Sequence, residues 1–362
     1  MSARSDLAPS PEPTVEPELV AREIGLAPRP RRWLAIAGLF GTAVLVFVVS
    51  RADLEQLRET ARGVEPVLVL LPVLATVGSY LTMARSYQGI AVAAGYRLSF
   101  MDMLRITLVA NTANYLLAAG GLSGFALRMY LFMRRGIPAG SAVLISLVQT
   151  LLTNLVLLAF VIGGFVLLLL SHSLGGRDLV VAGTLLLAFG VLVVLTAVLI
   201  FRGDLRRRAL FAATEIIHRS LRRFLPHRKP RRLKLLRFQR NLNAGLEFLL
   251  ERPHEMLAPT LWIILDWVFT LLVLHTAFVA IGHPLNAGYV IAGFAIGMFF
   301  SIVSLVPGGL GVLEGSMTAV FASLDVPLER AVVAILIFRV TYYGLPLLAS
   351  LVLARPTLRS VN

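Results

Sequence analysis

The segment Pro307-Gly308-Gly309-Leu310-Gly311-Val312-Leu313-Glu314-Gly315 interrupts a run of apolar residues that is otherwise typical of a membrane span. Its proline and glycines break a helix and release backbone N–H and C=O groups that hydrocarbon cannot satisfy. Such a break is tolerated at membrane depth only inside the protein or beside water. The segment therefore predicts a polar site within the bilayer.

A second, weaker break lies at Gly120-Gly121-Leu122-Ser123-Gly124, and Arg128 follows it closely. The apolar pieces on either side of the two breaks are 104–119 and 125–133, then 287–306 and 312–324. At about 1.5 Å per residue, the piece after each break is too short to cross a hydrocarbon core about 30 Å thick. We therefore expect two re-entrant helical hairpins.

The composition also places this chain in a membrane. Of its 362 residues, 57% are hydrophobic and 15% are charged, and the mean hydropathy is +0.81. Apolar runs long enough to cross as helices lie at 33–49, 64–83, 138–170, 179–201, 258–281 and 328–354. The predicted fold is an all-α integral membrane protein with about six full spans plus the two re-entrant hairpins.

The basic residues predict the orientation. Residues 202–240 contain fourteen Lys or Arg against Asp204 and Glu215, so the positive-inside rule places this loop in the cytoplasm. Further arginines before the first span, after the first hairpin and at the end of the chain agree with this assignment. Both termini are then cytoplasmic, and the protein is expected in the cytoplasmic (inner) membrane as a multi-pass protein.

With this orientation, residues 64–170 and 258–354 contain the same three elements with opposite polarity. Inverted repeats with broken helices that meet near the midplane are a recurring transporter architecture, because the two halves rock around one site. In sequence the two breaks share only Gly-Gly-Leu, a tripeptide common in membrane proteins. The inverted repeat is therefore an expectation from topology and hydropathy.

Outside the spans, residues 1–30 are rich in Pro and Glu and are expected to form a disordered cytoplasmic tail. Residues 31–356 form the predicted polytopic membrane domain, and 357–362 a short C-terminal tail. The basic loop, residues 202–255, has apolar residues at helical spacing, which predicts amphipathic helices on an anionic leaflet. Alternatively its arginines only set the topology. Nucleic-acid binding is not expected, because lipid contact accounts for the basic patch.

Four ionisable residues lie within or at the ends of apolar runs, namely Arg128, Asp266, Glu314 and Arg339. Each costs at least about 2.5 kcal/mol there unless it is paired or hydrated, so such residues usually mark a pathway or an internal ion pair. The half-helix that follows each break begins with unpaired N–H groups and a positive dipole end. Together with the two arginines, these ends suit the phosphate of a lipid.

These residues also have plainer structural explanations. Glu314 is alternatively a capping carboxylate, or it forms a bridge to Arg339 that fixes the hairpin against the last span. Asp266 alternatively lies near the cytoplasmic interface and is hydrated there. Polar residues that line a cavity, or that hold the helices together, are Asn111, Asn114, Gln149, Thr153 and Asn154.

Other chemistries find no support in the sequence. The absence of Cys excludes thiolate nucleophiles and thiolate-bound metals, and the six His are scattered without the spacing of a metal site. The Gly-x-Gly at Gly309 and Gly311 lacks the preceding strand that a dinucleotide or phosphate loop requires. We expect no metal, no cofactor and no catalytic residue.

The Pro307–Gly311 signature with Glu314, the earlier Asn114…Gly120-Gly121…Arg128 segment, and the closing Arg339…Pro346 stretch resemble one family. This is the flippase-like membrane domain of the lysylphosphatidylglycerol synthase (multiple peptide resistance factor) superfamily, and the resemblance covers about 33–354. It implies a bacterial or archaeal inner-membrane domain that moves a lipid to the outer leaflet. In the best known members it is fused to a soluble aminoacyl-transferase that lysinylates phosphatidylglycerol.

This chain ends at Asn362, directly after the last span, so we do not expect synthase activity. Residues 118–119 are alanines where many relatives have a proline before the glycine pair, so we expect a weaker first break.

We therefore expect the protein to bind an anionic or aminoacylated lipid and to flip it across the membrane. The lipid is a phospholipid or a polyprenyl-phosphate carrier, and a separate synthase or glycosyltransferase is a candidate partner. One alternative is a membrane-embedded transferase acting on a lipid-linked sugar, with Asp266 or Glu314 as the catalytic carboxylate. Another is a non-transporting scaffold for a separate lipid-modifying enzyme. The expected lipid-binding residues are Asn114, Gly120, Gly121, Arg128, Asp266, Pro307, Gly308, Gly309, Gly311, Glu314, Arg339 and Tyr342.

Overall fold

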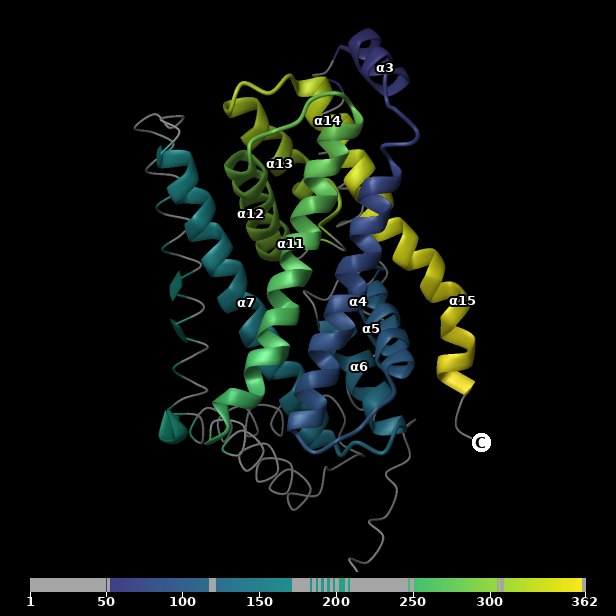
Figure 1. Ribbon diagram of the computed structural model, residues 1–362, viewed down its shortest axis with the longest axis vertical. Helices are drawn as coiled ribbons and strands as arrows, with labels where there is room; N and C mark the ends of the chain where they lie inside the picture. The colour runs from purple at the N-terminus through teal and green to yellow at the C-terminus, as the bar shows by residue number, and fades with distance from the viewer. Residues whose placement is uncertain are drawn as a thin grey trace, which may run out of the picture.

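The computed structural model describes residues 53–116, 122–170, 251–304 and 309–359, together with Ser50, Glu247, Val306 and single positions between 183 and 208. These described residues form helices and contain no strand, which confirms the all-α prediction (Figure 1). The predicted spans at 33–49 and 179–201, the N-terminal tail and most of the basic loop lie outside this part of the chain.

The described chain begins with a short helix, α3 (Leu54–Arg62), followed by a long one, α4 (Leu70–Ala93). The Asp53 side chain caps α3 by accepting hydrogen bonds from two backbone N–H groups of its first turn. The span predicted at 64–83 is displaced in the structure. The helix ends ten residues after the predicted end of the span. It continues past Arg85, the residue that ends the apolar run, because this side chain lies on the exposed side of the helix and stacks over the Phe100 ring.

The next three helices complete the first half of the fold, namely α5 (Phe100–Leu116), α6 (Leu122–Arg134) and α7 (Ala139–Leu170). The backbone N–H of Gly124 donates to Oδ1 of Asn114 at 2.6 Å. In one continuous helix, residues ten apart would be separated by about 15 Å. The chain therefore reverses between α5 and α6 and forms a helical hairpin. The expectation of a weaker first break concerns residues 118–121, which lie outside the described residues.

The second half repeats this order with η1 (Pro253–Met256), α11 (Leu257–Ala280), α12 (Ala287–Ser304), α13 (Val312–Ser323), α14 (Leu328–Arg339), η3 (Val340–Gly344) and α15 (Leu345–Arg359). The pair α12–α13 is the second hairpin. The predicted span at 328–354 is a continuous helical run, but its middle part, η3, is π-helical. Such segments are rare and frequently lie at functional sites.

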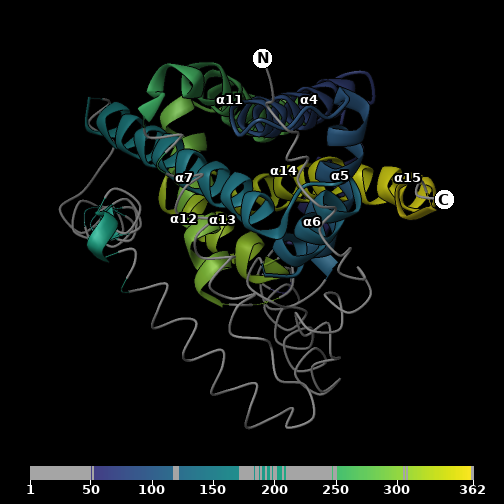
Figure 2. The ribbon, with the colours of Figure 1, turned by 90° about the horizontal axis from the view of Figure 1, so that it is seen from below.

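The two halves pack against each other reciprocally. Helix α7 of the first half contacts α12 of the second hairpin, and α15 at the end of the second half contacts α5 of the first hairpin. The two hairpins lie at opposite ends of the long α4–α11 pair, with α5–α6 at the lower end and α12–α13 at the upper end in Figure 1. Seen from below, α4 and α11 form one layer at the top of Figure 2, and both hairpins lie on the same side of it, lower in the picture. The inverted repeat, which depends on the orientation in the membrane, stays a prediction.

Glycines allow α4 and α11 to approach closely. A Cβ atom on Gly78 would lie 2.7 Å from ring carbons of Phe269, and one on Gly89 would lie 2.9 Å from Pro259. The positions along α4 rise as those along α11 fall, so the two helices run antiparallel. Small residues at such contacts are typical of helices that pack in membranes, where close van der Waals contact drives association.

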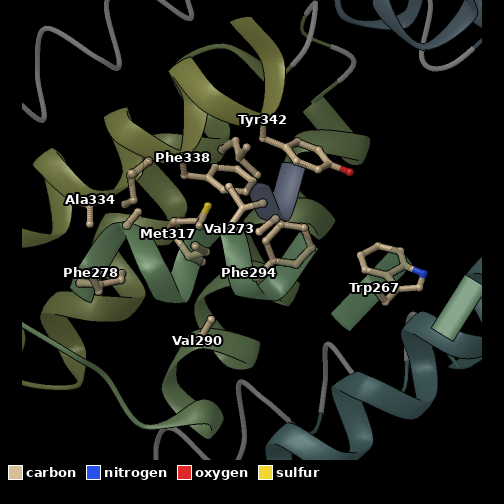
Figure 3. Packing of buried hydrophobic residues seen from close by; sticks show 14 of the residues in the cluster. Trp267, Val273, Phe278, Val290, Phe294, Met317, Ala334, Phe338 and Tyr342 are labelled. Atoms are coloured by element: carbon tan, nitrogen blue, oxygen red, sulfur yellow. The ribbon is translucent and has the colours of Figure 1, made fainter. Parts of the chain in front are cut away.

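Aromatic side chains fill the core of the second half (Figure 3). The Phe338 ring stacks on the Tyr342 ring with centroids 5.3 Å apart, and Phe294 meets Phe338 edge to face. Trp267 of α11 extends this group with an edge contact to Phe294. The π-helical segment η3 is therefore packed directly against the core formed with α11 and α12.

Three of the described helices are long and apolar enough to cross a membrane: Ala139–Gly163, Pro253–Ala280 and Leu328–Leu353. Helix α12 contributes a shorter apolar stretch, Ala287–Ser301. The expected number of spans and the cytoplasmic position of the termini remain predictions from the sequence.

Candidate functional site

The second hairpin turns at a glycine-dependent break. Gly309 and Gly311 have φ angles of +62° and +76°, in the left-handed region that residues with a Cβ adopt at a cost. A Cβ on Gly309 would also overlap the Ser301 hydroxyl on α12. Gly311 is the N-cap residue of α13, so the half-helix begins directly after the break, as predicted. The predicted site residues Pro307 and Gly308 lie outside the described residues.

An ion pair lies at the start of this half-helix. Glu314, in the first turn of α13, forms an ion pair with Arg339, with 2.5 Å between Oε1 and Nε, and the two side chains are 7% and 10% exposed. The Arg339 guanidinium also lies 4.4 Å from the centroid of the Tyr343 ring. The second carboxylate oxygen of Glu314 is buried and accepts no hydrogen bond from the described residues. The pair therefore offers a buried acceptor beside a guanidinium.

The first hairpin is closed by a side chain that caps its second half. Asn114, predicted as a site residue, accepts the Gly124 N–H of the first turn of α6. A Cβ on Gly124 would lie 2.3 Å from the Ala110 carbonyl oxygen, so α5 and α6 touch through backbone here. Gly120 and Gly121 lie outside the described residues.

Arg128, one turn after Gly124, is 5% exposed and is the buried charged residue of the described part of the first hairpin. Its Nη2 donates to Oδ1 of Asn111 at 2.8 Å, and its guanidinium lies 4.3 Å from the centroid of the Tyr87 ring. Its Nε is buried without a hydrogen-bond acceptor, and no carboxylate of the described chain pairs with it. A buried guanidinium held by neutral groups is suited to an anion, whose charge it would compensate.

Asp266 lies at the contact between α4 and α11, away from either break. It is 5% exposed, and its Oδ1 accepts from the Ser79 hydroxyl at 2.6 Å. The alternative that Asp266 is hydrated at an interface is therefore wrong, because protein surrounds it. The structure places Asp266 among the hydroxyl groups of α4 and α11.

The predicted residue Tyr342 connects Asp266 to the ion pair. Its hydroxyl lies 3.2 Å from Thr270 Oγ1, which in turn lies 3.3 Å from Ser79 Oγ. Its neighbour Tyr343 supports Arg339 through the ring contact described above. Consecutive residues of η3 thus contact Arg339 directly, through Tyr343, and reach Asp266 through the hydroxyl groups of Thr270 and Ser79, from Tyr342.

Sequence reasoning missed the partners of these charges. Tyr87, Ser79 and Tyr343 had no signal in the sequence, because each becomes relevant only through a contact with a distant segment. For Gln149 the structure favours the role of holding helices together, since its Oε1 accepts from Ser86 of α4. Within the described part of the chain, no group of three His, Cys, Asp or Glu is placed to hold a metal ion.

Comparisons with known proteins identify relatives of this fold. A family model described as the lysylphosphatidylglycerol synthase TM region matches residues 34–350. A UPF0104 membrane protein of Archaeoglobus fulgidus is 23% identical over 295 residues, which cover 79% of this chain and 85% of that protein. Phosphatidylglycerol lysyltransferases of Staphylococcus haemolyticus and Staphylococcus aureus are 30% and 29% identical over 89 residues, which cover 25% of this chain. This matched stretch spans 11% of the length of those lysyltransferases.

Proposed function

Since this chain belongs to the family of the lysylphosphatidylglycerol synthase transmembrane region, we propose that it binds an anionic or aminoacylated lipid and flips it across the cytoplasmic membrane. The membrane and a lipid are the partners that the family supports, because two of its relatives are named for the modification of phosphatidylglycerol. The flipping activity, the inner membrane and the lipid class are parts of the proposal.

The observation that carries the proposal is a buried charge beside each helix reversal. Arg128 lies on the half-helix after the first reversal, and Glu314 with Arg339 lies at the start of the half-helix after the second. Burial of these groups costs free energy that a structural role alone does not require, since apolar pairs of similar volume pack as well or better. The arginines are suited to hold the phosphate of a headgroup.

In the proposed mechanism, the headgroup enters between the hairpins while the acyl chains stay in the lipid. The phosphate binds Arg128 on the first hairpin, or Arg339 of α14 beside the second hairpin, and the half-helix N-termini add their positive dipole ends. The carboxylate of Glu314 orients Arg339 and offers its second oxygen to a cationic headgroup such as an aminoacyl group. Rocking of the two halves about the α4–α11 contact then exposes the site to either leaflet. No bond in the lipid is made or broken.

Purified protein in liposomes tests this proposal. We would measure the exchange of fluorescent phosphatidylglycerol, lysylphosphatidylglycerol and polyprenyl phosphate between leaflets with a membrane-impermeant quencher. We expect Arg128→Gln and Glu314→Gln to reduce exchange at least about tenfold, because each loss of a charged hydrogen bond weakens binding by about 1.5–3 kcal/mol. The matched control is Arg252→Gln, which breaks the exposed pair with Glu255 and should leave exchange unchanged.

The same experiment separates the alternatives. Chemical conversion of the lipid, detected by mass spectrometry, would favour a membrane-embedded transferase. Absence of both exchange and conversion for all three lipids, with a folded protein, would contradict the proposed function and leave the scaffold for a separate synthase or glycosyltransferase.

A further inference from the structure

Asp266 is a buried carboxylate without a cationic partner. It is the tenth residue of α11, and within the described chain no Arg, Lys or His forms an ion pair with it. Its recorded polar contact is the Ser79 hydroxyl at 2.6 Å. An unpaired carboxylate at membrane depth is costly when ionised, so a proton is its simplest compensation.

The surroundings of Asp266 contain phenols and hydroxyls but no described base. Tyr80 and Tyr87 of α4, Tyr115 of α5 and Tyr342 of η3 are the titratable groups in electrostatic contact with it. The segment of α7 contains no titratable residue, and that of α12 contains only Tyr289. The titratable residues of α14 are Arg339, which pairs with Glu314, and Glu329 and Arg330, which lie in the first turn of α14. Those of η1 are His254 and Glu255, directly before the start of α11.

Charge balance gives this proton a role in lipid binding. In the described chain the buried charged residues are Arg128, Asp266 and Glu314, and Arg339 is bound to Glu314. With Asp266 ionised, these four groups sum to zero. With Asp266 protonated they sum to one positive charge, which matches the single negative charge of a phosphodiester headgroup. A proton and an anionic lipid are therefore bound most favourably together.

The structure also contains the connection between the two sites. From Asp266, hydroxyl contacts lead through Ser79 and Thr270 to Tyr342, and the next residue, Tyr343, lies under the Arg339 guanidinium. Tyr343 also meets the ring of Tyr115 edge to face at 4.4 Å, near the end of α5 at the first reversal. These contacts pass through η3, a π-helical segment of the kind that frequently lies at functional sites.

We infer that Asp266 is a proton-binding site, and that one proton crosses the membrane with each anionic lipid. This inference rests on the proposed function and adds its energy source. A proton on Asp266 permits the tight α4–α11 contact to close over a neutral group, whereas the ionised carboxylate favours a hydrated, open arrangement. Cotransport of one proton with one phosphodiester anion is electroneutral, so a pH gradient drives it and a membrane potential does not.

The test uses the full chain in liposomes with fluorescent phosphatidylglycerol. A gradient of two pH units should change the steady-state leaflet ratio by up to about 100-fold, since each tenfold step corresponds to one pH unit for one proton. A potassium diffusion potential alone should have no effect. Asp266→Asn, whose side chain cannot take up a proton, should lose the response, so that its leaflet ratio is the same with and without the gradient. The control Asp53→Asn, an exposed cap residue, should keep the response.

A second measurement does not depend on transport or on a folded variant. Wild-type protein labelled with ¹³C-carboxyl aspartate should show, in infrared difference spectra recorded over a pH titration, a protonated carboxyl band shifted by the label. Absence of such a titrating band overturns the inference. If lipid exchange occurs but the leaflet ratio does not respond to the proton gradient, or responds to a sodium gradient instead, only the coupling of lipid transport to protons is overturned. Absence of exchange under every gradient overturns the proposed function, and the coupling with it.

Discussion

The ion pair between Glu314 and Arg339 either stabilises the hairpin or binds lipid, and a double-mutant cycle distinguishes these roles. The two single variants, Glu314→Gln and Arg339→Gln, each leave one buried charge without its counterion. The contact at 2.5 Å between side chains that are 7% and 10% exposed places the pair in the protein interior. Removal of one partner from such a pair costs about 3–5 kcal/mol of unfolding free energy.

The double variant should behave differently. With charge centres about 4 Å apart, the attraction is about 4 kcal/mol at an effective dielectric constant near 20. Desolvation costs several kcal/mol per ion, so the net stabilisation by the intact pair is small. We therefore expect Glu314→Gln/Arg339→Gln to lose only about 1 kcal/mol, with a coupling energy of at least about 5 kcal/mol, at the upper end of the range found for close charge pairs.

The assay combines stability and transport. Unfolding in mixed micelles, followed by circular dichroism, gives the four stabilities, and the liposome assay gives the four rates of lipid exchange. The matched cycle on the exposed pair Arg252–Glu255, with side chains 49% and 29% exposed, should show a coupling below about 1 kcal/mol. We expect all three variants of the buried pair to lose exchange. If the double variant regains both stability and lipid exchange, the ion pair only stabilises the fold, and its assignment to the lipid site is refuted.

Three further predictions concern packing, capping and pH. Gly78→Ala should lose about 1–3 kcal/mol of unfolding free energy, because the added Cβ meets an aromatic ring of α11. The control Gly163→Ala, whose Cβ would lie in open space, should be neutral or stabilising by up to about 1 kcal/mol. Denaturant unfolding measures both variants. Asn114→Ala should cost about 1 kcal/mol and increase hydrogen exchange in the first turn of α6, since it removes the cap. His283, between α11 and α12, has its pKa lowered by burial and then by the Arg330 charge. As the pH falls, His283 of the unfolded chain therefore takes up a proton first, near pH 6.5. The contribution of the neutral His283 to the unfolding free energy is present above that pH and is lost as the pH falls further. Arg330→Gln should make the unfolding free energy less dependent on pH between pH 7.5 and 5.5.

The sequence was sufficient to predict the breaks and the charges. Proline and glycine determine where a helix cannot continue, which is a local property, and the positive φ angles of Gly309 and Gly311 confirm it. The Glu314–Arg339 bridge was predicted as one of two alternatives, and the structure shows that it forms. A short apolar piece after a break also predicted the hairpins, because a length can be compared directly with the bilayer thickness.

The partners of the charges were not predictable in the same way. Ser79 and Asp266 lie 187 residues apart in the sequence and meet only because α4 and α11 pack antiparallel. The ring of Tyr87 over Arg128 depends in the same way on the contact between α4 and the first hairpin. The π-helical segment η3 has no marker in the apolar sequence around it, since its register reflects packing of Phe338 and Tyr342 in the core. Tertiary contacts set all three features.

The two hairpins have nearly symmetrical positions but unlike charges, and this difference bears on how a lipid would move. At the first hairpin, Arg128 has neutral partners, so a phosphate there compensates a buried cation. At the second, Arg339 is already bound to Glu314, so a phosphate must share the guanidinium with a carboxylate. In the mechanism we propose, an anion therefore leaves the first hairpin at a cost in free energy, and a compensating positive charge on the path reduces this cost. The proton on Asp266, which touches neither hairpin charge directly but reaches Arg339 through η3, supplies that compensation in the middle of the path.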